Sequence, residues 1–254
     1  MSRERINPYD RVALATDFGL ASPYIGQIRL KMATWDPSII LIDLISDLPP
    51  CRPDLAAYLL PALVRDLPSR TIYLTIVDPG VGGERMAIVL EADGNLYVGP
   101  DNGLLAKLAR RARQCQVWRI DWRPSTLSPS FHGRDLFAPA ALAMARGESI
   151  PLSPLEPNVL VGSDWPDEMS RIVYQDTFGN LMLGVRAAAL APSAMVRIGG
   201  QRVHRAQTFC EVSPGQVFWY ENAFGLVELA VNQGSAAQIL GLRVGDQVPL
   251  PEVE

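Results

Sequence analysis

TIYLTIVDPGVGGER, residues 71–85, begins as an unbroken β-prone apolar run and ends in a glycine-rich loop. Two similar runs, VALAT (12–16) and IILIDLI (39–45), precede it, and helical patterns cover 23–35 and 54–66. Buried strands that alternate with helices are typical of a parallel sheet covered by helices. The first part of the chain is therefore predicted to form an α/β domain with a mainly parallel sheet.

Further elements are predicted within this domain. MAIVLEADGNLYVGP (86–100) contains two β-prone runs joined by the turn sequence DGN, which predicts a hairpin inserted into the pattern. GLLAKLARRARQ (103–114) and DLFAPAALAMARG (135–147) are predicted to be helices. Ser22 and Pro23 are typical of an N-cap and a first helical residue, so a helix is expected to begin there.

The composition changes after Gly147. PLSPLEPN (151–158) holds three prolines in eight residues and is interpreted as a linker. Beyond it, short β-prone runs are separated by Gly, Asn and Pro, which is typical of a small barrel or sandwich. We predict an N-terminal α/β catalytic domain over residues 1–160 and a smaller C-terminal all-β barrel domain over residues 161–254.

Composition and charge exclude several classes of protein. The net charge of −4 gives no basic field, which argues against a nucleic-acid partner. The N-terminal sequence passes from charged residues into a strand-like run without the apolar segment of a signal peptide or membrane span, so we expect a cytoplasmic protein with no membrane partner. Three scattered cysteines and two histidines predict neither a disulfide framework nor a metal cluster.

The glycine-rich loop itself does not match a phosphate-binding loop. VDPGVGGER (77–85) lacks the Lys and Ser or Thr of a Walker motif, and a strand rather than a helix follows it. Pro79 and Gly80 suit a type II turn, which would bring Asp78 toward Arg85. Two interpretations stay open: an aspartate that caps a turn beside a neutralising arginine, or a pair that takes part in chemistry.

Three other polar islands lie where active sites of parallel sheets form, beyond the carboxyl ends of strands. They are TDFG (16–19), PDNG (100–103) and SFHGRD (130–135). Asp17 is a candidate ligand-binding residue or an Asx turn that caps the next helix. PDNG is interpreted as a β-turn rather than a ligand site. His132, between Phe and Gly, is expected to be half-buried.

Together these motifs resemble a known family. The resemblance extends from about Val12 to about Val248, in the family's order and spacing, and rests on TDFG with PYIG, VDPGVG with its following arginine, PDNG, FHGRD with FAP, DTFGN, and GSAAQILGL. It is a resemblance to the S-adenosylmethionine hydrolases, also called S-adenosylmethionine hydroxide adenosyltransferases, the sister group of the S-adenosylmethionine-dependent fluorinases and chlorinases. It implies an N-terminal α/β domain, a C-terminal β-barrel, and a homotrimer with active sites between subunits.

The resemblance also implies a reaction and its catalytic residues. Water or hydroxide attacks the ribose 5′ carbon of S-adenosylmethionine, and adenosine and methionine form without a metal or redox cofactor. The family's catalytic residues match Asp78, Arg85 and His132. Asp78 would orient the water and accept its proton directly or through a neighbour, Arg85 would keep Asp78 ionised, and His132 would complete the water's hydrogen bonds. The formal base stays open.

Substrate-binding residues carry over from the same resemblance. The matching positions are Asp17, Ser22, Asp176, Asn180, Ala223, Glu228, Val231 and Asn232. Asp17 would accept hydrogen bonds from the ribose hydroxyls. Asp176 and Asn180 would face the adenosine or the methionine end, and the last three positions lie where the family holds adenine. Phe131 or Phe178 is expected to pack either on the base or, preferably, in the core.

Four positions depart from the family pattern. Ser22 replaces an acidic residue near the methionine amine, Leu183-Gly184 replaces a Thr-Asn pair, Ala223 replaces a serine, and Asp47 replaces a histidine. Because lost hydrogen bonds weaken recognition by about 0.5–1.5 kcal/mol each, methionine recognition is expected to be weaker or different. The catalytic trio is intact, which favours an active enzyme.

Three functions follow from this sequence. The first is hydrolysis of S-adenosylmethionine to adenosine and methionine. The second is a halogenase-like reaction with chloride, which Asp78 and His132 disfavour because the halogenating relatives lack them at the matching positions. The third is a non-catalytic adenosine- or S-adenosylmethionine-binding protein, which the changes at Ser22 and Ala223 suggest.

Overall fold

The computed structural model describes residues 9–191, 194–198 and 200–249. The described chain forms two compact units. The first contains the described residues up to Ala57 and the segment Leu67–Asp164, and the second contains Tyr58–Asp66 and the described residues from Trp165 onward. Helix α2 (Pro53–Val64) begins in the first unit and ends in the second. The domain boundary after residue 160 stays a prediction.

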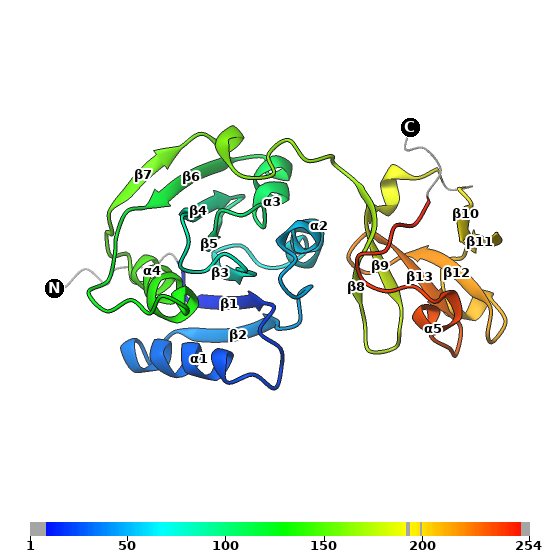
Figure 1. The fold of residues 1–254 in the computed structure, drawn as a ribbon, viewed down its shortest axis with the longest axis horizontal. Helices are drawn as coiled ribbons and strands as arrows, with labels where there is room; N and C mark the ends of the chain where they lie inside the picture. Colours follow the sequence, from blue (N-terminus) through cyan, green and yellow to red (C-terminus); the bar gives the residue numbers. More distant parts are fainter. Residues whose placement is uncertain (1–8, 192–193, 199, 250–254) are drawn as a thin grey trace. The chain divides into compact units, whose positions relative to one another are not determined.

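A seven-stranded sheet forms the centre of the first unit, in the order β2-β1-β3-β5-β4-β6-β7 (Figure 1). Strands β2, β1, β3 and β5 are parallel, whereas β4, β6 and β7 pair antiparallel to their neighbours. The strands are β1 (Arg11–Thr16), β2 (Ile40–Ile45), β3 (Thr71–Ile76), β4 (Ala87–Ala92), β5 (Asn95–Pro100), β6 (Cys115–Ile120) and β7 (Leu152–Leu155). The predicted α/β class is confirmed.

Two predictions fail at the edges of this sheet. The run containing β2 was expected to be fully buried, but β2 is an edge strand in which Ile40 and Ile42 are 52% and 40% exposed. PLSPLEPN is not a linker, because β7 forms the opposite edge and places Pro154 opposite Trp118 of β6. An edge strand tolerates proline because one row of its backbone groups has no partner in the sheet.

The predicted hairpin is confirmed in strands β4 and β5. Ala92 pairs with Asn95, so only Asp93 and Gly94 form the turn. Both turn residues have positive φ angles, 48° and 80°, as a type I′ turn requires.

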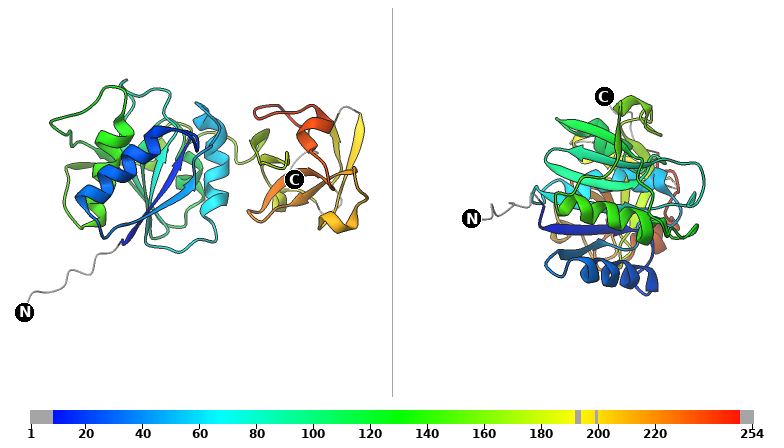
Figure 2. Two further views of the ribbon diagram at one scale, coloured as in Figure 1. Left: turned by 90° about the horizontal axis from the view of Figure 1, so that it is seen from below. Right: turned by 90° about the vertical axis from the view of Figure 1, so that its left-hand side faces the viewer.

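Helices of the first unit follow the predicted pattern closely. They are α1 (Pro23–Trp35), α3 (Ala106–Arg111), the π-helix η1 (Gly133–Phe137), α4 (Ala138–Ala145) and the 3-10 turn η2 (Pro157–Val159). As predicted, Ser22 caps α1 and accepts a hydrogen bond from the Tyr24 N–H. Helix α1 packs against η1 and α4 (Figure 2). Its Ile28 and Met32 are fully buried in a core shared with the sheet.

The second unit is a six-stranded sheet that curls into a half-barrel, in the order β10-β11-β12-β13-β9-β8 (Figure 1). Its core contains Trp219, Leu181 and Leu229, which are fully buried. Its elements are β8 (Met169–Gln175), β9 (Leu181–Arg186), η3 (Ala187–Ala189), β10 (Val196–Ile198), β11 (Gln201–Arg205), η4 (Phe209–Glu211), β12 (Val217–Glu221), β13 (Leu226–Val231) and α5 (Ala236–Leu240). The predicted all-β class is confirmed, and β11 is a strand that sequence analysis missed.

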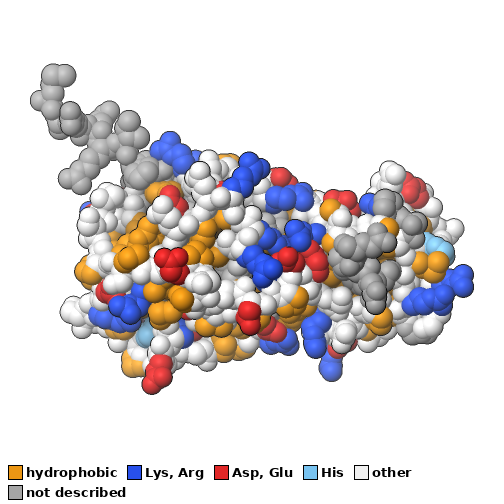
Figure 3. Space-filling view, turned by 90° about the horizontal axis from the view of Figure 1, so that it is seen from above, with side chains coloured by type: hydrophobic (Ala, Val, Ile, Leu, Met, Phe, Trp, Pro, Cys, Tyr) orange, Lys and Arg blue, Asp and Glu red, His pale blue; other side chains and the backbone are white. Residues whose placement is uncertain are grey.

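Basic and acidic side chains are interspersed on the face drawn in Figure 3. Neighbouring opposite charges form pairs such as Arg119 with Asp121 and Arg146 with Glu148. Over the described residues, no helix combines the length and the apolar character needed to cross a membrane.

Candidate functional site

The polar islands of the first unit meet at the carboxyl edge of the parallel strands. Because β1, β3 and β5 are parallel neighbours, the loops that follow them leave the sheet on the same side. Asp17 follows β1, Asp78 follows β3, and Asn102 follows β5. The Asp17 N–H donates to the Ile76 carbonyl at 3.3 Å, which joins the first two loops directly.

Asp78 and Arg85 form a two-pronged ion pair. Arg85 Nε lies 3.0 Å from Asp78 Oδ1, and Arg85 Nη2 lies 2.5 Å from Asp78 Oδ2. The two side chains are only 5% and 10% exposed, respectively. A planar guanidinium that contacts both carboxylate oxygens fixes the orientation of the carboxylate as well as its charge.

The loop between these residues is not the predicted type II turn. The Val81 N–H does donate to the Asp78 carbonyl at 3.3 Å, but Gly80 lacks the positive φ angle that such a turn needs. The left-handed residue is Gly82, with a φ angle of 81°. A Cβ atom on Gly82 would lie 2.4 Å from the Pro129 carbonyl oxygen. The tip of this loop therefore packs against the segment that leads to His132.

His132 joins the pair through the same arginine. Arg85 Nη2 lies 2.9 Å from His132 Nδ1, and because a guanidinium only donates, Nδ1 must accept. The ring proton therefore resides on Nε2. Burial and the nearby positive charge of Arg85 lower the pKa of His132 below its usual value, so the imidazole is neutral at neutral pH.

His132 lies at the start of a short π-helix, η1, which is followed directly by α4. His132 precedes η1, in which Asp135 is buried and ionised. Hydrogen bonds from Arg134 and from Lys31 of α1 hold the pKa of Asp135 well below its usual range. Asp135 also accepts from the Ser128 N–H at 3.2 Å. These contacts fix the loop before His132 to two helices, and π-helical turns of this kind are frequent at functional sites.

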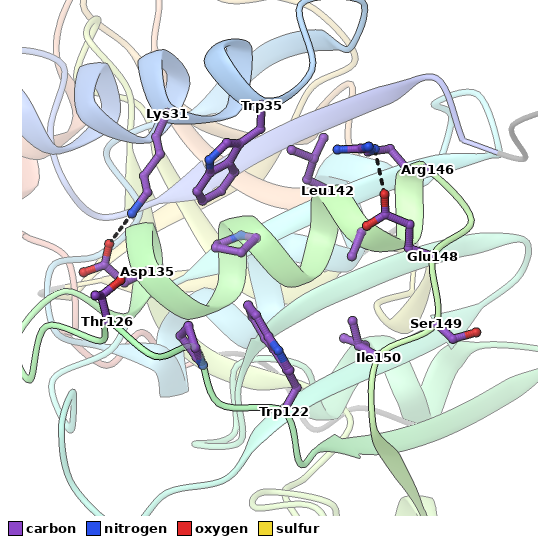
Figure 4. A pocket seen from close by; sticks show the side chains of 13 residues that line it. Lys31, Trp35, Trp122, Thr126, Asp135, Leu142, Arg146, Glu148, Ser149 and Ile150 are labelled. Atoms are coloured by element: carbon purple, nitrogen blue, oxygen red, sulfur yellow. Dashed lines mark hydrogen bonds and ion pairs between the residues drawn. The ribbon is translucent and has the colours of Figure 1, made fainter.

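A cavity of about 460 Å³ lies across α4. Figure 4 shows the Lys31–Asp135 pair at one end of it. Trp35 of α1 and Trp122 line opposite sides of this cavity, and Arg146 pairs with Glu148 at its other end. None of the predicted site residues lines it. The cavity is therefore separate from the Asp78–Arg85–His132 cluster.

Asp17 is half-buried beside this cluster. Its Oδ2 atom accepts from the Cys51 N–H at 2.9 Å, and Cys51 adopts a positive φ angle of 57° to present that group. Burial raises the pKa of Asp17, and the charge of Asp78 adds to the rise. The helix-capping alternative for Asp17 is wrong, because Ser22 caps α1.

Three aromatic rings gather next to these residues. Phe131 lies 5.2 Å from Tyr24 and 6.1 Å from Phe18, measured between ring centroids. Phe131 also packs against the core of the first unit, as expected. Phe178 of the second unit does not, because it is 76% exposed, and the core interpretation is wrong for that residue.

Predicted site residues of the second unit surround another cavity, of about 560 Å³. It is lined by Asp176, Phe178, Asn180, Phe209, Tyr220, Val231, Gln233 and Gly234. Asp176 accepts from the Phe178 and Asn180 N–H groups at 2.9 and 2.8 Å, and its other oxygen accepts from Asn180 Nδ2 at 2.9 Å. Asn180 is buried, and its Oδ1 atom has no hydrogen-bond partner among the described residues.

The two late motifs of the sequence meet at this cavity. Gly179 has a φ angle of 85°, and a Cβ atom on it would lie 2.1 Å from Ser235 Oγ. The Gly179 carbonyl accepts from the Ala237 N–H at 2.9 Å, while Ser235 caps α5. The DTFGN turn is therefore fixed to the start of α5, which explains why both motifs are needed for one local structure.

The remaining predicted binding residues have different surroundings. Glu228 is buried and accepts from the Tyr220 hydroxyl at 2.6 Å and from Asn222 Nδ2 at 2.8 Å, and burial raises the pKa of Glu228. Asn232 donates from its side chain to the Val212 carbonyl at 2.7 Å. Ala223 is exposed in the β12–β13 turn and does not line the cavity. Of Val231, Glu228 and Ala223, only Val231 lines the cavity and can contact a ligand there.

Two positions that depart from the family pattern, Leu183 and Asp47, are also not among the residues that line the cavity. Leu183 is fully buried in the core of the second unit, and Asp47 is exposed. Sequence analysis missed Tyr220 and Gln233, which do line the cavity. Tyr220 lies in the run VFWYE, whose aromatic residues predict only core packing. Gln233 has a positive φ angle of 55°, which nothing in its sequence context signals.

The protein thus consists of an α/β unit with a half-buried Asp–Arg–His cluster, followed along the chain by a β unit with a partly polar cavity. The chain matches the family models of the SAM (S-adenosylmethionine) hydroxide adenosyltransferase N-terminal domain over residues 12–153 and C-terminal domain over residues 170–249. It therefore belongs to the SAM hydroxide adenosyltransferase family.

Individual relatives agree with this assignment. A curated protein of Salinispora tropica, named (R)-S-adenosyl-L-methionine hydrolase, is 34% identical over 95% of this chain and 97% of its own length. A protein of the same name from Thermus thermophilus is 36% identical over 94% of this chain and 98% of its own length. The crystal structure of an uncharacterized conserved protein from Thermotoga maritima superposes with a TM-score of 0.83 at 28% identity, covering 94% of this chain and all of that one.

Proposed function

We propose that this protein hydrolyses S-adenosylmethionine to adenosine and methionine. The observation that carries the proposal is the half-buried, hydrogen-bonded cluster of Asp78, Arg85 and His132 at the carboxyl edge of β3. Family membership and the names of its curated relatives support the same reaction.

The reaction balances without a metal or redox partner. A water oxygen attacks the ribose 5′ carbon as the bond from that carbon to sulfur breaks, and the electron pair of that bond stays on sulfur. The sulfonium becomes the neutral thioether of methionine, one water proton passes to the protein, and the hydroxyl remains on adenosine. Because an anion-like nucleophile and a cation combine into neutral products, a site with little water accelerates this step.

We propose a different task for each of the three side chains, and their geometry supports this division. Arg85 occupies Nδ1 of His132, so the neutral imidazole retains only its Nε2–H and acts as a hydrogen-bond donor that orients the water. Asp78 is then the proposed proton acceptor, and hydrogen bonds from Arg85 to both of its carboxylate oxygens hold it in place. A positioned base of this kind typically accelerates a reaction by about 10²–10⁴-fold.

Each unit by itself has candidate residues for binding the nucleoside. We assign to Asp17 the ribose hydroxyls, because its carboxylate is half-buried beside Asp78 and retains acceptor capacity beyond the Cys51 N–H. We assign to the cavity of the second unit the adenine ring. The buried Asn180 Oδ1 atom there suits the amino group of adenine, because an unpaired buried acceptor costs about 1–3 kcal/mol until a donor reaches it. Roles of Ser22, Ala223 and Glu228 in binding stay predictions.

One product analysis tests the proposal and separates it from its alternatives. The purified protein is incubated with S-adenosylmethionine, with and without chloride, and the products are separated chromatographically. We expect adenosine and methionine in equal amounts whether or not chloride is present. Formation of 5′-chloro-5′-deoxyadenosine would instead support the halogenase-like reaction, and retention of S-adenosylmethionine without any product would support a binding protein.

We further propose that the protein is a homotrimer with active sites at subunit interfaces, as the family resemblance implies. Exposed apolar side chains on and near edge strand β2 support an interface on the first unit, since large exposed apolar residues mark interaction surfaces. Leu20, Leu30 and Ile40 are each more than half exposed. Light scattering is expected to give three times the 27.8 kDa chain mass, and a monomer would contradict the proposal. The cytoplasmic location also stays a proposal.

A further inference from the structure

The PDNG loop, residues 100–103, holds both ends of the loop that carries Asp78 and Arg85. Asn102 Nδ2 donates to the Val77 carbonyl at 2.8 Å, directly before Asp78. The Asp101 N–H donates to the Met86 carbonyl at 2.9 Å, directly after Arg85. One loop after β5 therefore grips the catalytic loop after β3 at its entry and its exit.

The contact from Asn102 is the one that depends on a side chain. The ladder between β3 and β5 ends at the pair Leu74 and Val98, so Val77 lies beyond it although it is fully buried. A buried carbonyl without a donor is costly, and the Asn102 amide supplies that donor. The Asn102 oxygen accepts from the Leu104 N–H at 3.3 Å, which fixes which end of the amide faces Val77.

We infer that Asn102 is a positioning residue for catalysis, which sets the position of the Asp78–Arg85 pair by holding the Val77 carbonyl. This inference rests on the proposed function, because it takes Asp78 as the proton acceptor. It goes beyond the interpretation of PDNG as a simple β-turn. The effect extends to His132, since Arg85 contacts both Asp78 and His132 Nδ1.

Two variants remove the contact in different ways. Asn102→Ala leaves the Val77 carbonyl without its donor, whereas Asn102→Asp keeps the size and the acceptor for Leu104 but turns an oxygen toward Val77. The matched control is Asn95→Ala, because the Asn95 oxygen accepts from the Thr71 N–H at 3.0 Å at the opposite end of β3. Asn95 thus binds the backbone at the first residue of β3 and Asn102 binds it directly after the last, and only Asn102 does so next to Asp78.

We expect kcat for S-adenosylmethionine to fall about 10- to 100-fold in both Asn102 variants, because small misplacement of reacting groups has effects of that size. KM is expected to change by less than about threefold, since the loss concerns the transition state rather than binding. Asn95→Ala is expected to keep the parent kcat. Equal losses in Asn95→Ala and Asn102→Ala, or parent kcat in Asn102→Ala, would overturn the inference.

A second readout does not require turnover. The chain has two histidines, so the His132 ring signals can be assigned in NMR spectra by comparison with a His204→Gln variant. Burial and Arg85 lower the pKa of His132, with a smaller opposing effect from Asp78 and further effects from Arg123 and Asp135. The protonation midpoint of His132 is therefore expected below 6.5 in the parent, and to rise toward that value in Asn102→Ala as the contact with Arg85 loosens.

The pH dependence of kcat is expected to shift in the same direction as the pKa of His132. Protonation of His132 puts a donor on Nδ1 against Arg85, so activity falls as the pH drops through the lowered pKa, and this limb moves to higher pH in Asn102→Ala. An unchanged His132 midpoint in a folded Asn102→Ala protein would overturn the inference. A parent protein that forms no adenosine would instead refute the proposed function, while the NMR midpoint would still report on the placement of Arg85.

Discussion

Asp78→Asn is expected to lower kcat for S-adenosylmethionine hydrolysis by about 10²–10⁴-fold. The amide cannot accept the water proton, and its NH₂ group is a donor where Arg85 needs an acceptor at 2.5–3.1 Å. Chromatographic release of adenosine measures the loss, and calorimetry with adenosine is expected to show nearly unchanged binding.

The control for this substitution is another aspartate beside an arginine. Asp10 pairs with Arg11 at 2.8 Å but is 61% exposed and lies before β1, away from the carboxyl edge of the sheet. Exposed pairs of this kind contribute little, so Asp10→Asn is expected to leave kcat unchanged. Parent turnover in Asp78→Asn would remove Asp78 from the mechanism.

Gly82→Ala is also expected to have a large effect, a fall in kcat of about 10- to 100-fold. Its new Cβ atom would lie 2.4 Å from the Pro129 carbonyl oxygen and must separate the Asp78–Arg85 loop from the segment before His132. The positive φ angle adds a strain of about 1 kcal/mol. Kinetics and thermal unfolding of the same sample measure the two effects separately.

Gly147→Ala is the control that separates the backbone strain of a positive φ angle from the steric clash with Pro129. Gly147 also has a positive φ angle, 66°, but a Cβ atom there would meet nothing within 4 Å. We expect a similar small loss of stability and an unchanged kcat. If both alanine variants lose stability equally and neither loses activity, the contact between the two loops has no role in placing His132.

Much of the fold was predictable because its signals are local. The runs that form β1 and β3 are continuous and apolar because successive residues of these central strands are buried. Ser22 and Pro23 were enough to predict the start of α1, because capping depends on local sequence. Strand β7 was missed because prolines suggest a linker, and only its pairing with β6 shows that an edge position tolerates them. Burial of β2 was overestimated for a related reason, since apolar sequence does not reveal which strand lies at an edge.

The candidate site was harder to predict from local sequence signals. Asp78 and Arg85 are seven positions apart, so their pairing followed from a turn, but His132 lies 47 positions further along and the family resemblance was needed to group it with them. The turn itself was assigned to Gly80 rather than Gly82, because the deciding contact with Pro129 is distant in sequence. Asn102 was interpreted as turn chemistry, and its bond to Val77 emerges only when β5 is placed beside β3.

The way Arg85 binds two partners also constrains the order of events in a catalytic cycle. Before the reaction, Arg85 and Asp78 cancel in charge and His132 is neutral, so the cluster presents no net charge to a cationic sulfonium. In the proposed reaction Asp78 takes the water proton, and the same three side chains would then carry one positive charge. A second sulfonium would then be repelled. The proton must therefore leave to solvent before the next substrate binds, which makes proton release a step that separates successive turnovers.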